Sequence, residues 1–287
     1  MKFKGVSIFQ VRALAAIRRA DAGRFRLVFG GGTALSRAHR LTLPMSEDID
    51  LKIVAGVPSS RKELRRLRDN ITDSLRDAGF AFDPANRAHR ESGNESRYTI
   101  YRLPYSPLAT DTEVLRPVIQ IETALWPLRR PSVDRDVASF FTEAFGLQPE
   151  LSLMPCADHT ETVAEKFVAL TRRAGEEQAE PDAPRDTTLV RHVYDLHIVL
   201  KNCDWDEVIG LVREIMQADA EAYGHRFHAY RADPITETLR AVKGLERDEG
   251  YSRTYDAFTQ HMVYGEIPEF GTALATVAAL AERLRDR

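Results

Sequence analysis

The sequence predicts an α+β fold, in which helices and strands alternate over the first 130 residues and helices dominate the remainder. Strand-like alternation of apolar and polar residues recurs in four segments, 25–29, 48–54, 98–103 and 118–125. Past Pro131, nearly every periodic segment has helical spacing instead. We therefore predict two domains, 1–130 and 131–287, a number that fits a chain of 287 residues.

The elements of the first domain follow from local patterns. Residues 8–19 keep one apolar helical face, and the Ala-Gly pair at 22–23 ends that helix. The strand 25–29 runs into Gly30-Gly31-Gly32, and a short helix is expected at 33–39. After the strand 48–54, Ser60 and Glu63 form a capping box that starts a second helix, and Gly79 ends it. The last two strands are separated by a loop that contains proline.

The second domain is expected to be mostly helical. Helical spacing predicts helices over 133–145, 159–174, 187–201, 205–217, 234–247 and 270–286. The segment 174–185 contains two prolines and several acidic residues, which indicates an exposed loop between two of these helices.

Charge is distributed unevenly along the chain. The net charge of -3 excludes a uniformly basic protein that coats nucleic acid. Residues 1–103, however, carry 20 basic and 11 acidic side chains, whereas residues 104–287 carry 20 and 32. The basic half suits a polyanionic ligand, although a solvated charged surface would have the same composition.

Cysteine usage and hydropathy indicate the compartment. Cys156 and Cys203 lie far apart and outside any CxxC spacing, which predicts neither a zinc ribbon nor a disulfide framework. No segment approaches the ~20 apolar residues of a membrane span, and no signal-peptide pattern follows Met1. We expect a soluble, cytoplasmic protein with no membrane partner.

The most specific pattern is a glycine turn followed by two aspartates. Gly31 and Gly32, placed between a strand and a helix, can adopt positive φ and direct backbone N–H groups at a phosphate. Asp48 and Asp50 are two residues apart on a strand, so both carboxylates project from one face and can share divalent cations. The alternating Ile49 and Leu51 are expected in the core.

A third carboxylate is expected if two Mg²⁺ ions are to be held. Glu122 is the best candidate, because the isoleucines at 119 and 121 face one side of their strand and Glu122 faces the other. The alternative is an ordinary acidic residue on a solvent-facing strand.

Four segments of the chain resemble a known family. They are GGTALS at 31–36 with MSEDIDL at 45–51, EKFVAL at 165–170 followed by two arginines, RHVYDL at 191–196, and the run 255–270. In this order they resemble the motifs of the AbiEii/AbiGii (MenT) toxins, a branch of the polymerase-β-like nucleotidyltransferases. Gln120 departs from the pattern, since many relatives have lysine before the strand glutamate.

The resemblance implies a function. It implies an N-terminal nucleotidyltransferase domain with a mixed sheet, and a helical domain that completes the active-site cleft. The implied reaction is Mg²⁺-dependent transfer of a nucleoside monophosphate from a nucleoside triphosphate (NTP) to RNA, with the tRNA 3′ end as the expected acceptor and a block of translation as the result. A type IV toxin–antitoxin system would supply a cognate antitoxin. DNA is not an expected partner.

The resemblance also marks further residues of the site. Gly31, Gly32 and Thr33, together with Ser36 and Ser46, are expected to bind the triphosphate.

Two residues of the second domain join this set. Lys166 is expected to reach the β- and γ-phosphates and to offset charge on the leaving pyrophosphate. Asp195 could orient the acceptor hydroxyl, contact the nucleotide or pair with Lys166.

Two other classes of function stay open at this point. The same fold can nucleotidylate a small molecule, such as an aminoglycoside, or a protein hydroxyl. A non-catalytic nucleotide-binding regulator is the third reading. The histidines, including His192 and His197, lack nearby ligands in a metal-binding spacing and are expected to have core or surface roles.

Overall fold

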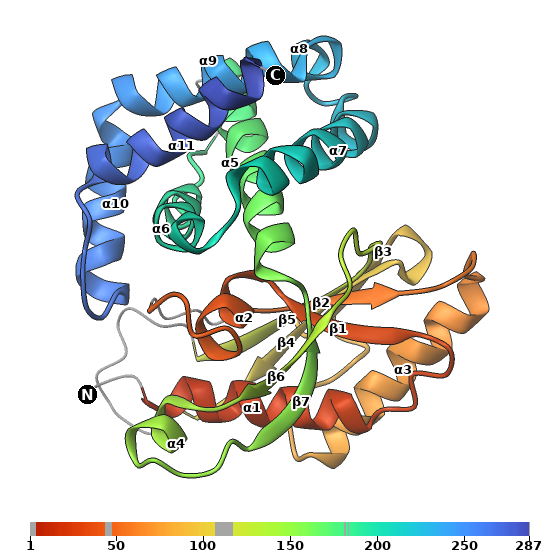
Figure 1. Ribbon diagram of the computed structural model, residues 1–287. Coiled ribbons are helices and arrows are strands. Elements are labelled where there is room, and N and C mark those ends of the chain that lie inside the picture. Colours follow the sequence, from red (N-terminus) through yellow and green to blue (C-terminus); the bar gives the residue numbers. More distant parts are fainter. Residues whose placement is uncertain (1–3, 44–47, 107–116, 181, 183, 287) are drawn as a thin grey trace. The chain divides into compact units, whose positions relative to one another are not determined.

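The computed structural model describes residues 4–43, 48–106, 117–180, 182 and 184–286 (Figure 1). The chain forms two compact units. The first comprises Met1–Arg40 and Met45–Asp158, and the second comprises Leu41–Pro44 and His159–Arg287. The division at Asp158 lies beyond the boundary near residue 130 that the sequence suggests, because the chain returns to the sheet after that point.

A mixed sheet forms the first unit and confirms the α+β class. Its seven described strands lie in the order β3-β4-β5-β2-β1-β7-β6. β2 pairs with β5, and β1 with β7, in parallel, while the remaining pairs are antiparallel. The strands are β1 Arg26–Gly30, β2 Asp48–Val54, β3 Arg90–Gly93, β4 Tyr98–Pro104, β5 Val118–Leu125, β6 Val133–Val137 and β7 Leu151–Cys156.

Helices cover one face of this sheet. The helices of the unit are α1 Lys4–Arg19, α2 Gly31–Arg37, α3 Arg61–Asp77 and α4 Phe140–Ala144, with a 3₁₀ turn η1 at Asn94–Ser96. α1 and α3 pack together against the sheet (Figure 1). The expected capping box of Ser60 and Glu63 is present at the start of α3. Ile49 and Leu51 of β2 are buried in the core, as predicted.

The helix predicted over 133–145 is wrong. Residues 133–137 form β6, and only Phe140–Ala144 are helical. β6 is the last strand of the sheet, so Asp134, Arg135 and Asp136 remain exposed and the segment shows no period-two apolar pattern. This strand and β7 place the segment in the sheet unit.

The second unit is helical. Its helices are α5 His159–Ala179, α6 Leu189–Val199, α7 Trp205–Tyr223, α8 His228–Ala232, α9 Pro234–Arg247, α10 Glu249–Met262 and α11 Phe270–Arg285, with a 3₁₀ turn η2 at Leu200–Asn202. α5 packs against α6, α7 and α9, which makes it the central helix of the unit. It continues through the first half of the segment 174–185 that was predicted to be a loop, because Ala174 is buried and Gly175 gives room to the ring of Phe227.

Two expectations about the whole chain can be compared with the structure. Both cysteines are free thiols. Among the described residues, no helix combines the length and the hydropathy needed to cross a membrane.

Candidate active site

The glycine turn and the second aspartate are neighbours in the sheet unit. Gly30 ends β1 as the register partner of Asp50 on β2. Gly31 follows with φ of +69°, the left-handed conformation that the sequence predicted for this turn. A Cβ atom built on Gly31 would lie 1.8 Å from Oδ2 of Asp50. Only glycine therefore lets the chain enter α2 while Asp50 keeps its place.

Replacing Gly31 by Ala is expected to lower the free energy of unfolding by about 2 kcal/mol or more, since a left-handed alanine costs about 1–2 kcal/mol before any contact is counted. Displacement of Asp50 should also reduce catalytic activity. Gly23→Ala is the matched control, because Gly23 also has positive φ (+55°) but open space around it. Urea unfolding of both variants checks the prediction, and equal losses of stability would show that the Asp50 contact has no influence.

Acidic side chains from two parallel strands meet beside this turn. Asp48 and Asp50 of β2 are the register partners of Gln120 and Glu122 of β5. Their alternation with buried Ile49 places them on the face opposite the core. The strand pairing thus brings Asp50 and Glu122 together, as expected for a shared site.

Glu122 is held by two hydrogen bonds. The hydroxyl of Tyr98 donates to Oε2 at 2.9 Å, and the side-chain amide of Gln120 donates to Oε1 at 2.8 Å. Burial and the Glu122 carboxylate raise the pKa of Tyr98, so the phenol stays protonated and remains a donor. Tyr98 has no signal in the sequence, because it contacts Glu122 only when β4 and β5 pair.

The chemistry of the donors fits a hard divalent cation, since carboxylate oxygens are the ligands that Mg²⁺ takes in proteins. Asp48 and Asp50 supply such oxygens from one face of β2. Within the described residues, however, no three His, Cys, Asp or Glu side chains are arranged to hold a metal ion. Glu122 as a third ligand therefore stays a prediction, and its two hydrogen bonds leave a lone pair on each carboxylate oxygen.

The hydroxyls of the glycine-turn motif bind backbone. Thr33 donates its hydroxyl to the carbonyl of Asp48, and Ser36 donates to the carbonyl of Thr33 at 3.2 Å. Both side chains are buried. Thr33 thus joins the start of α2 to the start of β2. Ser46 lies outside the described residues, and the roles of Thr33, Ser36 and Gly32 in nucleotide binding stay predictions.

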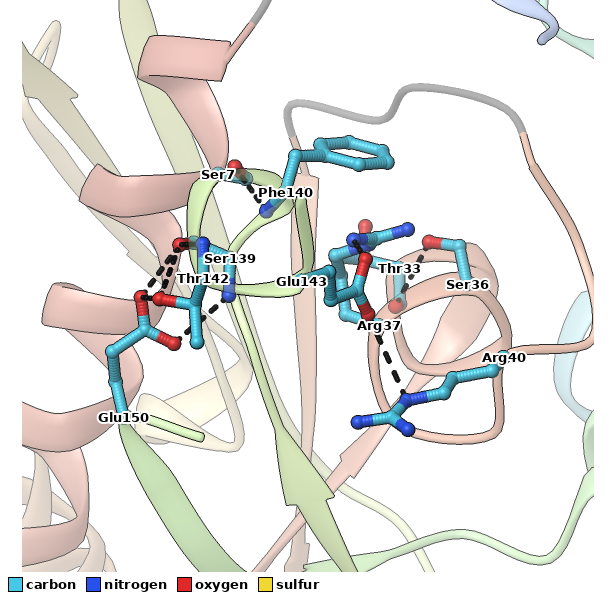
Figure 2. Close-up of polar contacts among 10 residues, drawn as sticks. All are labelled: Ser7, Thr33, Ser36, Arg37, Arg40, Ser139, Phe140, Thr142, Glu143 and Glu150. Carbon is cyan, nitrogen blue, oxygen red and sulfur yellow. Dashed lines mark hydrogen bonds and ion pairs between the residues drawn. The ribbon is translucent and has the colours of Figure 1, made fainter. Parts of the chain in front are cut away.

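The far end of α2 is fixed by an ion pair that the sequence analysis did not find (Figure 2). Arg37, 4% exposed, pairs with Glu143 of α4 at 2.7 Å, and Arg40 lies 3.7 Å from the same carboxylate. The Arg37 guanidinium also stacks 3.5 Å from the ring centroid of Phe140. These contacts hold the helix that follows the glycine turn.

α4 is held in place by hydrogen bonds at its N-terminal end. Ser139 caps α4, and Glu150 accepts hydrogen bonds from the Ser139 backbone and from the hydroxyls of Ser139 and Thr142 (Figure 2). The N–H of Phe140 donates to Oγ of Ser7 on α1 at 3.0 Å. The glycine turn therefore rests on a series of contacts that reaches α1.

In the helical unit, the two motif residues form a buried ion pair. Nζ of Lys166 on α5 lies 2.9 Å from Oδ2 of Asp195 on α6. The two side chains are only 11% and 5% exposed. The structure thus shows one of the three predicted roles of Asp195, pairing with Lys166, and it places Lys166 away from the solvent-exposed position of an ordinary surface lysine.

His192 lies beside this pair, with Nδ1 3.5 Å from Nζ of Lys166. Burial and the Lys166 charge lower the pKa of His192 well below 6.5. As the pH falls through about 6.5, His192 therefore takes up a proton in the unfolded chain but stays neutral in the folded protein.

This difference predicts the pH dependence of stability. Neutral His192 makes its full contribution to the free energy of unfolding above about pH 6.5. Below that pH the free energy of unfolding falls by up to about 1.4 kcal/mol per pH unit. Urea unfolding between about pH 5 and 7.5 should show a smaller decline for His192→Asn than for the wild type. His225→Asn, at an exposed position, is the control. An unchanged slope for His192→Asn would contradict the assignment.

Comparisons with known proteins bear on the fold and the family of the chain. Among solved structures, MenT4, a nucleotidyltransferase toxin from Mycobacterium tuberculosis H37Rv, matches with a TM-score of 0.58 and 19% identity. The match covers 100% of this chain and 85% of MenT4, and at this identity it shows the fold alone. Comparison with curated proteins gave no significant match. Residues 12–276, however, match the family described as nucleotidyl transferase AbiEii toxin, type IV toxin–antitoxin system. The chain belongs to this family of nucleotidyltransferase toxins.

Proposed function

We propose that the protein transfers a nucleoside monophosphate from an NTP to an RNA, with the 3′ end of tRNA as the acceptor, and thereby blocks translation. The observation that carries this proposal is the contact of the glycine turn with Asp50, which lies in register with Glu122. A phosphate-binding turn next to adjacent carboxylates suits phosphoryl transfer, in which positioning and charge compensation account for most of the catalysis.

In the proposed reaction, the acceptor hydroxyl gives its proton to solvent and its oxygen forms a bond to the α-phosphorus. The bond from the α-phosphorus to the oxygen that bridges it to the β-phosphorus breaks, and pyrophosphate leaves. The backbone N–H groups of the glycine turn orient the triphosphate. Asp48 and Asp50 are the residues that would hold Mg²⁺, in a site for two ions if Glu122 joins them. When bound, Mg²⁺ lowers the pKa of the acceptor hydroxyl and neutralises charge on the phosphates.

Lys166 and Asp195 have proposed roles of their own. The Lys166 ammonium would bind the leaving pyrophosphate, since a compact cation neutralises charge on phosphate oxygens. Its ion pair with Asp195 limits the directions in which the ammonium can point. Asp195 is then a positioning residue for Lys166.

The direct test incubates the purified protein with each α-labelled NTP, total tRNA and Mg²⁺, followed by electrophoresis. We expect label in RNA with at least one nucleotide, and loss of label with EDTA or in the Asp50→Asn variant. Label found in protein or in an added aminoglycoside, but not in RNA, would contradict the choice of acceptor. No transfer to any acceptor would contradict the proposed reaction.

Membership in the toxin family implies an antitoxin partner and an NTP substrate. We propose that expression of the protein without its antitoxin arrests growth. Asp48→Ala should abolish this arrest if catalysis causes it. If the protein were a non-catalytic nucleotide-binding regulator, the wild type and the Asp48→Ala variant would arrest growth equally.

A further inference from the structure

A polar pocket lies in the sheet unit between α3 and the turn that joins β3 to β4. Its volume is about 350 Å³. Its lining consists of Arg61, Arg65 and Arg68 from α3, the last two residues of β3 and the turn residues 94–96. We call it the arginine pocket. None of these described lining residues belongs to the glycine turn or is one of the candidate carboxylates Asp48, Asp50 and Glu122.

Two of the three arginines are available for a ligand. Arg61 and Arg65 are exposed, and neither forms an ion pair with another described residue. Arg68 uses its Nε and Nη2 atoms to bind Asp69, at 3.0 and 2.7 Å, while its Nη1 lies 3.5 Å from Oγ of Ser96. Glu95 is the one acidic residue among the described lining, so positive charge dominates the pocket.

The arginines form one row on α3. Positions 61, 65 and 68 follow the i, i+4, i+7 spacing that places side chains on the same helix face. The row is about 10 Å long at 1.5 Å per residue. Guanidinium groups in such a row suit successive anionic groups, because each can donate two hydrogen bonds to one phosphate.

The opposite wall has an unusual backbone. Asn94, Glu95 and Ser96 have φ values of 47°, 56° and 66°, so three consecutive residues other than glycine are left-handed. Such conformations are rare and occur preferentially at ligand clamps and active sites. The turn ends two residues before Tyr98, the residue that holds Glu122. The pocket and the candidate carboxylates are thus joined by the first residues of β4.

We propose that the arginine pocket binds backbone phosphates of the RNA acceptor. This inference rests on the proposed RNA substrate, and it adds a binding site outside the reaction centre. Every described lining residue is charged, polar or glycine. The centre of a protein interface is enriched in aromatic and other apolar side chains, and none of the described lining residues has such a side chain. Phosphates on a flexible backbone need only the guanidinium groups that are present.

The test measures binding of fluorescently labelled total tRNA by anisotropy at several salt concentrations. The protein carries Asp50→Asn throughout, so that no transfer alters the RNA. The test variant is Arg61→Gln/Arg65→Gln. The control is Arg19→Gln/Arg76→Gln, which removes the same charge from exposed positions of α1 and α3 outside the pocket. Thermal unfolding of each variant confirms that it is folded.

We expect the pocket variant to bind about tenfold more weakly at physiological salt, and the slope of log affinity against log salt to be less steep by about 1.5. The control should change both quantities much less. Glu95→Gln should raise the affinity, because it removes the acidic group that faces the same phosphates.

Equal losses in the pocket and control variants would overturn the inference, since they would reflect net charge alone. Unchanged RNA affinity combined with lost antitoxin binding would assign the pocket to a protein and overturn it as well. If the wild type labels RNA but Arg61→Gln/Arg65→Gln binds it normally, the proposed function stands and this inference fails. If the wild type labels no RNA yet binds it through these arginines, the pocket stands and the proposed reaction fails.

Discussion

Asp50→Asn is expected to lower kcat/KM for nucleotidyl transfer by about 10³-fold or more, which corresponds to about 4 kcal/mol of lost transition-state stabilisation. The amide keeps the size of the side chain but loses the charge that binds a divalent cation. Because Asp50 lies in register with Glu122 and two residues from Asp48, removing its charge also relieves repulsion. We therefore expect the midpoint of thermal unfolding to stay the same or to rise.

Asp134→Asn makes the same chemical change on β6, at an exposed strand position outside the candidate site, and it should leave both rate and stability unchanged. Rates are measured with labelled NTP and tRNA, and unfolding by calorimetry. An Asp50→Asn variant that retains more than about a tenth of wild-type activity would contradict the assigned role, since one decade is only about 1.4 kcal/mol. A large fall in stability would show instead that Asp50 is structural.

Lys166→Met is expected to lower the free energy of unfolding by about 3–5 kcal/mol, because it leaves Asp195 as a charge without its partner in a buried position. Asp195→Leu should cost a similar amount by leaving the Lys166 ammonium unpaired. The double variant Lys166→Met/Asp195→Leu should recover most of this loss, since apolar residues often replace a buried ion pair at little cost.

The activity of these variants shows whether Lys166 and Asp195 have a structural or a catalytic role. If Lys166 binds the leaving pyrophosphate, the double variant should be as stable as the wild type yet transfer nucleotide at least about 10²-fold more slowly. Lys166→Arg should keep some of the activity, because it retains the positive charge. A stable double variant with wild-type activity would limit Lys166 and Asp195 to a structural role. Urea unfolding and steady-state kinetics on the same preparations decide between these outcomes.

Strong local patterns predicted much of the fold. β2 and β5 have the expected bounds, because each strand buries alternate residues beneath a polar face. α9 also has the predicted bounds, with Asp233 as its N-cap and Pro234 in its first turn. These signals depend only on neighbouring residues, so the sequence contains them in full.

The strands that were not predicted from the sequence lie where this logic fails. β3 and β6 are the two outermost strands of the sheet, and their sequences RESG and VDRDV are polar since an edge strand is largely exposed. β7 contains Pro155 and exposed Leu153, which interrupt its alternation. A helix over 133–145 was predicted because nothing local distinguishes an exposed edge strand from a polar helix.

The candidate site likewise has features that the sequence predicts and features that it does not. The positive φ at Gly31 and the shared face of Asp48 and Asp50 follow from the residues themselves. The hydrogen bond from Tyr98 to Glu122 joins residues 24 positions apart, and that from Arg37 to Glu143 spans 106. Neither had a sequence signal, because each depends on which strands and helices become neighbours.

The return of the chain to the sheet has a practical consequence for working with fragments of this protein. β1, which leads into the glycine turn, contacts β7 through Phe29 and Cys156, and the N–H of Ala157 donates to the carbonyl of Phe29 at 2.8 Å. A polypeptide cut near residue 130 would lack that neighbour and would expose the backbone of β1 to strand addition by other molecules. Dissecting the protein into separately expressed halves is therefore better done after Asp158, which leaves only Leu41–Pro44 of the helical unit on the N-terminal half.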